Sequence, residues 1–189
     1  MEGNILTNRS KNRRPSDYYP TPEDVTQALI DYLEIPKTKV IWECACGEGF
    51  MADVFKSNGY QVISTDLNSY GYEDATENFL ESKGKECDWI ITNPPFSLSE
   101  QFIRKCIEFR KPFAMLLKSQ YWHSKKRFPL FRQHPPSCVL PLTWRPDFEF
   151  GLRGGQPTME CIWTVWNAEP SFYTIYEPLK RTIKKENEL

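Results

Sequence analysis

The chain has 189 residues, enough for one domain and too few for two of ordinary size. Hydrophobic residues make up 40% of it, which is typical of a chain with one core and excludes a disordered protein. The net charge is −1, and we find no apolar run of about eighteen residues and no secretory signal, so we expect a cytoplasmic protein without a membrane span.

The cysteine pattern gives little support to a metal centre. Six cysteines and two histidines occur, and no two cysteines form a C-x-x-C pair. Cys44 and Cys46 lie two positions apart in an apolar run, where they would share one face of a strand. We therefore expect reduced thiols in the core and no metal site.

The first predicted element follows a polar, basic stretch. Residues 1–16 show no hydrophobic periodicity and predict a flexible basic arm. Next, Thr21 is a candidate helix cap and Pro22 a candidate first helical residue. Apolar residues then recur at helical spacing through Leu33, which predicts a helix in this segment.

Short apolar runs and helical patterns alternate over the next part of the chain. This alternation predicts a doubly wound, mostly parallel α/β sheet, whose ligands bind at the carboxyl ends of the strands. Gly47, Gly49, Asp66 and Asn93 all lie at such strand ends. The predicted strands are 39–46, 61–66, 87–92 and 112–117, and the predicted helices are 51–60, 97–110 and, more weakly, 77–82.

The pattern changes after Lys118. Segment 119–135 is basic and aromatic, with a possible helix that Pro129 would interrupt. Strands or hairpin arms are predicted at 138–142, 148–158 and 159–167, with a turn at Gly154-Gly155. We expect the charged C-terminal tail to be frayed.

Positive charge is concentrated in the same region. Residues 110–146 contain no Asp or Glu, and a smaller basic cluster lies in residues 9–14. One-sided positive charge favours phosphate binding, although a solvated basic face fits charge alone equally well. The basic residues of this stretch are Arg110, Lys111, Lys118, Lys125, Lys126, Arg127, Arg132 and Arg145.

A glycine turn follows the first predicted strand. Glu43 precedes Gly47 and Gly49, and glycine allows positive φ and close approach to a ligand. Asp66 ends the next strand, where an acid can accept hydrogen bonds from ribose hydroxyls. The third glycine of the dinucleotide fingerprint is missing, which argues against a pyrophosphate cradle.

The pattern E-x-A-x-G-x-G over residues 43–49 resembles the first motif of class I S-adenosylmethionine methyltransferases. The resemblance implies that the glycines pass beneath the methionine part of the cofactor, that Glu43 orders the loop and that Asp66 holds the ribose. Asn78 would lie near the cofactor adenine, where the family often has Asp. The expected cofactor-binding residues are Tyr19, Thr21, Pro22, Glu43, Ala45, Gly47, Gly49, Asp66, Leu67, Asn78, Phe79 and Asn93.

The most informative stretch ends in Asn93-Pro94-Pro95-Phe96. Proline favours extended geometry at the preceding residue, which commits the Asn93 side chain to one direction. The Asn93 side-chain oxygen and the Pro94 carbonyl could bind the two N–H groups of an aromatic amine and stabilise the charge that develops on nitrogen during methyl transfer. Phe96 offers a face on which a planar base can stack.

The pattern D-x-x-x-x-N-P-P-F over residues 88–96 resembles the catalytic motif of amino-group methyltransferases, above all the N6-adenine DNA enzymes. The resemblance assigns catalysis to Asn93, Pro94, Pro95 and Phe96. Segment 17–22 resembles the part of these enzymes that packs over the methionine end of the cofactor. Thr21 and the helix N-terminus could then meet the methionine carboxylate.

The resemblance also suggests how nucleic acid is bound. A base in a duplex must be flipped out to reach the cofactor. Tyr121 and Trp122 are candidates for stacking on the flipped base, and core aromatics are an equally good interpretation. Trp144, Arg145 and Phe148 form a weaker set. The expected nucleic-acid residues are Lys118, Tyr121, Trp122, Lys125, Lys126, Arg127, Arg132 and Arg145.

Taken with the motifs, the order of elements predicts a class I methyltransferase fold with an antiparallel C-terminal strand. We expect a basic arm at 1–16, one methyltransferase domain at 17–170 with a small recognition insertion at about 119–160, and a charged tail at 171–189. The expected activity is S-adenosylmethionine-dependent methylation of adenine N6 in DNA. The same chemistry on RNA, cytosine N4 or protein glutamine, or a cofactor-binding regulator without turnover, remains open, as does the oligomeric state.

Overall fold

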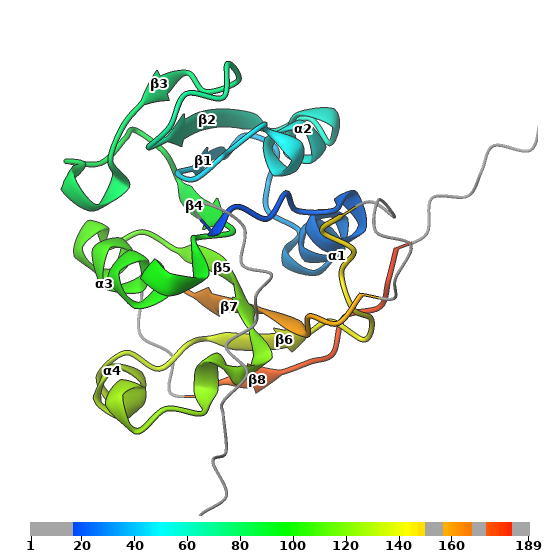
Figure 1. Cartoon of the computed structure of the whole chain (residues 1–189), viewed down its shortest axis with the longest axis vertical. Coiled ribbons are helices and arrows are strands. Elements are labelled where there is room, and N and C mark those ends of the chain that lie inside the picture. Colours follow the sequence, from blue (N-terminus) through cyan, green and yellow to red (C-terminus); the bar gives the residue numbers. More distant parts are fainter. Residues whose placement is uncertain (1–16, 150–156, 168–172, 183–189) are drawn as a thin grey trace, which may run out of the picture.

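The computed structural model describes residues 17–149, 157–167 and 173–182. A sheet of eight strands runs through this part of the chain in the order β3-β2-β1-β4-β5-β7-β6-β8 (Figure 1). The strands are β1 Val40–Glu43, β2 Gln61–Asp66, β3 Ala75–Thr76, β4 Trp89–Thr92, β5 Phe113–Lys118, β6 Cys138–Pro141, β7 Cys161–Trp166 and β8 Ile175–Tyr176. Strands β1 to β5 pair in parallel, and β7 is antiparallel to both β5 and β6. The predicted mostly parallel sheet with an antiparallel C-terminal strand is confirmed.

Helices cover both faces of the sheet. α1 and α2 lie on one side and α3 and α4 on the other (Figure 1). The α-helices are α1 Glu23–Leu33, α2 Phe50–Ser57, α3 Ser99–Phe109 and α4 Phe128–Gln133, and the short 3₁₀ helices are η2 Phe79–Glu81, η3 Phe96–Leu98, η4 Ser119–Trp122 and η5 Lys125–Arg127. Within the described ranges, no helix is long and apolar enough to cross a membrane.

Successive residues of the central strands face opposite helical layers. In β5, Leu116 packs in the cluster that contains Leu29 of α1, whereas Met115 packs in the cluster that contains Ile103 of α3. All four side chains are fully buried. Burial of each such side chain contributes about 1.5–3 kcal/mol, and burial on both faces explains why the strands are continuous apolar runs in the sequence.

The structure corrects two expectations about prolines at helix starts. Pro22, not Thr21, is the N-cap of α1, and no side chain caps this helix. The Thr21 hydroxyl is instead bonded to another part of the chain. Pro129 lies in the first turn of α4, where it begins the helix rather than interrupting it, because a missing N–H costs nothing there.

The region after α4 contributes a strand to the sheet. β6 pairs with β7 and β8, which confirms the strand predicted at 138–142. Glu149 and Phe148 lie in a turn rather than a strand, and the predicted Gly154-Gly155 turn lies outside the described residues, as does the basic arm 1–16.

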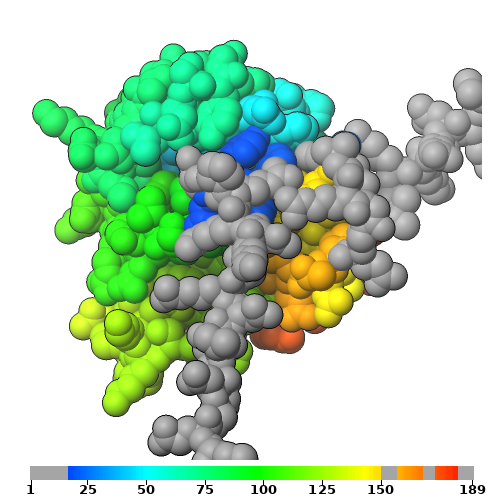
Figure 2. Space-filling model, viewed as in Figure 1, coloured from blue at the N-terminus to red at the C-terminus, as the bar shows by residue number. Residues whose placement is uncertain are grey.

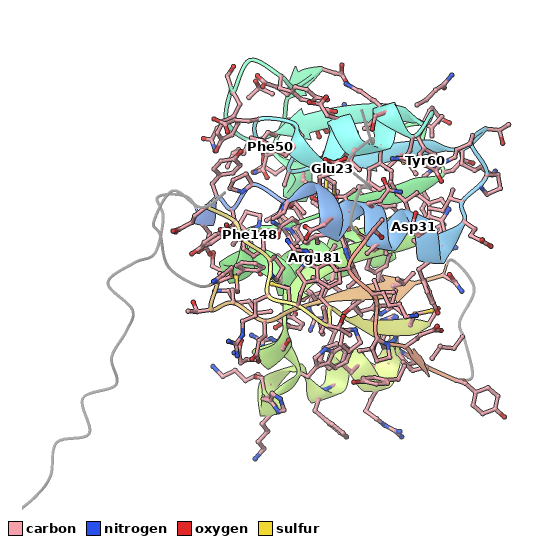
Figure 3. All side chains as sticks on the ribbon, turned by 90° about the vertical axis from the view of Figure 1, so that its right-hand side faces the viewer. Glu23, Asp31, Phe50, Tyr60, Phe148 and Arg181 are labelled. Atoms are coloured by element: carbon pink, nitrogen blue, oxygen red, sulfur yellow. The ribbon has the colours of Figure 1, made fainter. Side chains whose placement is uncertain are left out.

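Part of the expected C-terminal tail is built into the domain. β8 pairs in parallel with β6, and Leu179 is buried. Arg181 lies beside α1, where its Nε donates to Asp24 Oδ2 at 2.6 Å (Figure 3). Residues 173–182 therefore pack along the sheet and α1, because β6 leaves an edge that a further strand can pair with.

Candidate active site

A cavity of about 480 Å³ lies at the carboxyl ends of β1, β2 and β4. Its size falls within the range of small-molecule and cofactor sites. The segment before α1 forms part of its wall, and the first described residues lie between the surfaces of the β1–β3 and the α3 regions (Figure 2). The expected cofactor-binding residues that line it are Tyr19, Thr21, Glu43, Ala45, Asp66, Leu67, Asn78, Phe79 and Asn93.

The Asp66 carboxylate joins the end of β2 to the glycine loop. Its Oδ2 accepts from the Gly47 N–H at 2.9 Å, and its Oδ1 accepts from the Asn68 N–H at 2.9 Å. Each carboxylate oxygen has a further lone pair, so the group remains able to accept from a ligand in the cavity that it lines. The Asp66 carboxylate is therefore held in place by the loop and still able to accept hydrogen bonds from a ligand.

The two loop glycines make room for tyrosine rings. Gly47 has a φ of 53° and Gly49 a φ of 86°, which is the left-handed region. A Cβ on Gly47 would overlap the ring of Tyr18, and one on Gly49 would overlap the ring of Tyr72. Neither glycine lines the cavity itself. The rings of Tyr18 and Tyr72 therefore pack directly against the two loop glycines.

Glu43 is a buried acid at the base of the cavity. Its side chain is 2% exposed, and Oε2 has no hydrogen-bond partner among the described residues. Burial raises the pKa of the Glu43 carboxyl well above its ordinary value; a backbone hydrogen bond from Ala52 opposes this shift and the charge of Asp66 adds to it. A buried carboxyl without a partner on one oxygen is suited to a ligand that carries a hydrogen-bond donor.

Asn93 is held in one orientation by the segment before α1. Its Nδ2 donates to the Tyr19 carbonyl at 2.9 Å and to Thr21 Oγ1 at 3.1 Å. A carbonyl only accepts, so the atom facing Tyr19 must be the amide nitrogen. Both N–H groups are then used, and Oδ1 is the part of the amide left as an acceptor for a ligand.

An aromatic cluster with one lysine flanks Asn93. The Tyr19 ring lies 5.4 Å from the Phe96 ring and 5.7 Å from the Phe148 ring, centroid to centroid. Lys118 Nζ lies 4.6 Å from the Phe96 centroid. No salt bridge joins Lys118 to a carboxylate of the described residues, so its charge is available to an anion.

Of the other NPPF residues, only one lines the cavity. Pro95 lines the cavity, whereas Pro94 is buried and Phe96 lies outside the cavity wall. Pro22, Gly47 and Gly49 do not line the cavity either. Phe96 contacts Tyr19 and Lys118, and Tyr19 also lines the cavity, so the aromatic cluster adjoins the cavity at this point.

The remaining residues expected to contact nucleic acid have different surroundings. Tyr121 is 7% exposed and lies beneath Arg127, whose Nη1 donates to the Tyr121 carbonyl at 2.6 Å. Trp122 stacks on Phe131 at 4.3 Å. Tyr121 and Trp122 thus match the alternative of core aromatics. Lys125, Lys126 and Arg132 are exposed, and Arg145 pairs with Glu160.

Two positioning contacts were not predicted from the sequence. Asp17 is buried, and its Oδ2 accepts from the Ser97 N–H at 2.9 Å, next to the NPPF motif. The Tyr18 hydroxyl contacts Glu48, and its ring stacks on Tyr70 at 5.1 Å. The only sequence signal was the clustering of polar and aromatic residues before α1, which does not reveal long-range partners.

Comparison with known proteins gives distant relatives. The chain is 25% identical over 138 residues to the type II methyltransferase M.MgeORF184P of Mycoplasma genitalium, covering 58% of this chain and 43% of the relative. It is 24% identical over 155 residues to the type II methyltransferase M.MpnI of Mycoplasma pneumoniae, covering 67% and 48%. The chain thus spans less than half the length of these curated relatives, and no family model matches it.

Solved structures share the fold at low sequence identity. A protein of Pyrococcus horikoshii proposed to be an RNA methyltransferase superposes with a TM-score of 0.65 at 15% identity, covering 82% of this chain and 89% of that one. A methyltransferase subunit of a type I restriction-modification system from Streptococcus thermophilus gives a TM-score of 0.58 at 12% identity, covering 79% and 44%. In its sheet order the chain has the fold of the class I S-adenosylmethionine-dependent methyltransferases, and its glycine loop and NPPF motif resemble theirs.

Proposed function

We propose that this protein transfers a methyl group from S-adenosylmethionine to the exocyclic N6 amino group of adenine in DNA. The observation that carries the proposal is the orientation of the Asn93 amide. With both N–H groups bonded to Tyr19 and Thr21, its Oδ1 is presented as an acceptor at the cavity. An acceptor is what an amino group requires from a protein that activates it.

The lone pair of an adenine amine is delocalised into the ring and is a poor nucleophile. Asn93 Oδ1 and the Pro94 carbonyl would accept from its two N–H groups and favour a more tetrahedral nitrogen. These fixed acceptors also stabilise the positive charge that develops on nitrogen as the methyl group arrives. No strong base is needed before transfer, and the remaining contribution is the alignment of the reacting atoms.

The residues lining the cavity fit the proposed cofactor, which supplies an electrophilic methyl group on a sulfonium. Asp66 would accept from the ribose hydroxyls with the lone pairs that the loop leaves free. Glu43 has one buried oxygen without a partner among the described residues, which can accept from a donor group of the methionine part. Asn78 Oδ1 already accepts from Leu80 N–H at 3.1 Å, so its amide nitrogen is the group left for the adenine edge.

Support for a nucleic-acid substrate comes from Phe96, which packs on the cavity-lining Tyr19, and from Lys118 beside this ring. A flipped base could stack on Phe96, and Lys118 beside this ring could contact a phosphate. Exposed Lys125, Lys126 and Arg132 extend the positive surface. The distant relatives are described as type II methyltransferases, which favours DNA over the other acceptors.

We propose one domain over residues 17–170, in which the recognition segment 119–160 also supplies β6 to the sheet.

The test is to incubate the purified protein with S-adenosylmethionine carrying a labelled methyl group and with DNA, RNA or protein in parallel. Treated DNA is then digested to nucleosides and analysed by mass spectrometry. We expect N6-methyldeoxyadenosine from DNA, and far less of it in the same time with the Asn93→Ala variant. N4-methyldeoxycytidine, or label found only in RNA or in protein glutamine, would show that the proposed acceptor is wrong. Calorimetric cofactor binding without any transfer would favour a regulator.

A further inference from the structure

We propose that Thr21 is a positioning residue, whose hydroxyl fixes the face that the Asn93 amide presents to the acceptor amine. The proposal rests on the proposed function, because it concerns how that amine is held. It also reassigns Thr21, since the family resemblance places this residue at the methionine carboxylate. The structure instead gives its oxygen an acceptor role toward Asn93 Nδ2 at 3.1 Å.

The Thr21 hydroxyl is not needed by its own helix. α1 has Pro22 as N-cap, with no side-chain hydrogen bond to the first turn. Thr21 is nevertheless 4% exposed, and a buried hydroxyl is costly unless it is bonded. Its bonded partner among the described residues is Asn93, 72 positions away in the chain. The side chain is therefore placed for the catalytic motif and not for helix capping.

Two hydrogen bonds are needed to fix the orientation of the Asn93 side-chain amide. If the amide group rotated by half a turn, its oxygen would face the Tyr19 carbonyl, and its N–H groups would face the acceptor amine, donor against donor. The Tyr19 carbonyl disfavours that rotation through one N–H, and Thr21 Oγ1 holds the second. With both in place, the amide plane and the direction of Oδ1 are set before any substrate arrives.

The location of Thr21 does not depend on Asn93 alone. The segment that carries it is tied to the NPPF motif by Asp17 Oδ2, which accepts from Ser97 N–H at 2.9 Å. The Tyr19 ring also packs on Phe96 at 5.4 Å. Removing the Thr21 hydroxyl should therefore leave the segment in place and affect chiefly the amide.

The chain offers a matched pair of variants. Thr21→Val keeps the shape of the side chain and removes the acceptor, whereas Thr21→Ser keeps the acceptor and removes a methyl group. Thr21→Ala is a second variant without the acceptor, for use if valine disturbs folding. Each is measured for kcat and KM, for binding of S-adenosylhomocysteine by calorimetry, and by NMR of the Asn93 side-chain NH₂ in the whole protein, assigned with Asn93→Asp.

We expect Thr21→Val to lower kcat on the order of tenfold, the effect of one lost hydrogen bond to a reacting-site amide. Binding of S-adenosylhomocysteine should stay unchanged, and the Asn93 NH₂ signals should shift and exchange faster with solvent. Thr21→Ser should restore both the kcat and the signals. Unchanged kcat and NH₂ signals in Thr21→Val, failure of Thr21→Ser to restore them, or weakened cofactor binding at unchanged kcat would each overturn the proposal.

The failure of this inference is distinguishable from failure of the proposed function. If the wild-type protein methylates another class of acceptor, the adenine assignment is lost. The NH₂ signals of the free protein would still report whether Thr21 holds Asn93. If adenine is methylated and the signals do not respond to Thr21→Val, the positioning role alone is rejected.

Discussion

Tyr18 lies so close to Gly47 that a single added carbon on the glycine would overlap the tyrosine ring. The ring cannot easily move away, because its hydroxyl contacts Glu48 and its face stacks on Tyr70. The glycine loop and the segment before α1 are thus packed as one unit around the cavity. The same segment holds Asn93, so it joins the cofactor side of the site to the catalytic motif.

Gly47→Ala should destabilise the protein through both backbone strain and overlap with Tyr18. Gly59→Ala is the matched control, since Gly59 has a φ of 86° but nothing within 4 Å of an added Cβ. We expect a loss of about 1–2 kcal/mol for Gly59→Ala from strain, and about 1–3 kcal/mol more for Gly47→Ala. Urea unfolding measures both losses. When Gly47→Ala is made in the Tyr18→Ala protein, its cost should fall to that of Gly59→Ala. Equal losses for the two glycine variants would contradict the packing argument.

Asn93→Ala and Asp66→Ala should separate turnover from cofactor binding. Loss of the Asn93 acceptor should lower kcat on the order of 10²–10³-fold, as for one donor of an oxyanion hole, and leave S-adenosylhomocysteine affinity nearly intact. Asp66→Ala removes charge-assisted hydrogen bonds and should weaken that affinity on the order of 10–100-fold. Single-turnover kinetics and calorimetry provide the two measurements. Full turnover by Asn93→Ala would mean that the proposed mechanism is wrong.

Glu43→Gln should change the pH dependence of stability. In the folded protein burial raises the pKa of Glu43 well above its ordinary value of 4.5, so the folded state keeps a proton that the unfolded state releases. The wild type therefore loses stability relative to Glu43→Gln as pH rises above that ordinary value, until the folded carboxyl also ionises. Urea unfolding at several pH values between about 4 and about 8 should show that the difference in the free energy of unfolding between the two proteins grows with pH. A difference between the two proteins that stays constant over this range would contradict the effect of burial.

Lys118→Ala should weaken DNA binding and reduce its dependence on salt. If Lys118 contacts a phosphate, its removal lowers the slope of log affinity against log salt by about 1. Lys39→Ala is a control, because Lys39 Nζ is paired with Asp88 Oδ1 at 2.9 Å before β1. Fluorescence anisotropy with a labelled duplex at several salt concentrations measures both. An unchanged slope for Lys118→Ala would argue that the lysine only packs on Phe96.

The sequence by itself predicted the order of the main elements and named several of the residues that line the cavity. Buried parallel strands are continuous apolar runs, and the polar residues that end them must meet at one edge of the sheet, so Glu43, Asp66 and Asn93 could be grouped before any coordinates. The short strand β8 escaped prediction, because two exposed residues pairing with a distant edge leave no periodic signal.

Only the tertiary structure decided what each side chain does there. Thr21 is a plausible cap in sequence, and Tyr121 and Trp122 are plausible stacking residues next to basic neighbours. Their contacts depend on how the chain packs, since Thr21 accepts from Asn93, 72 positions away, and Trp122 stacks on Phe131 of α4. Local pattern determines the strands and turns, whereas hydrogen-bond partners and ring contacts arise from the packing of the sheet, and no spacing in the sequence encodes them directly.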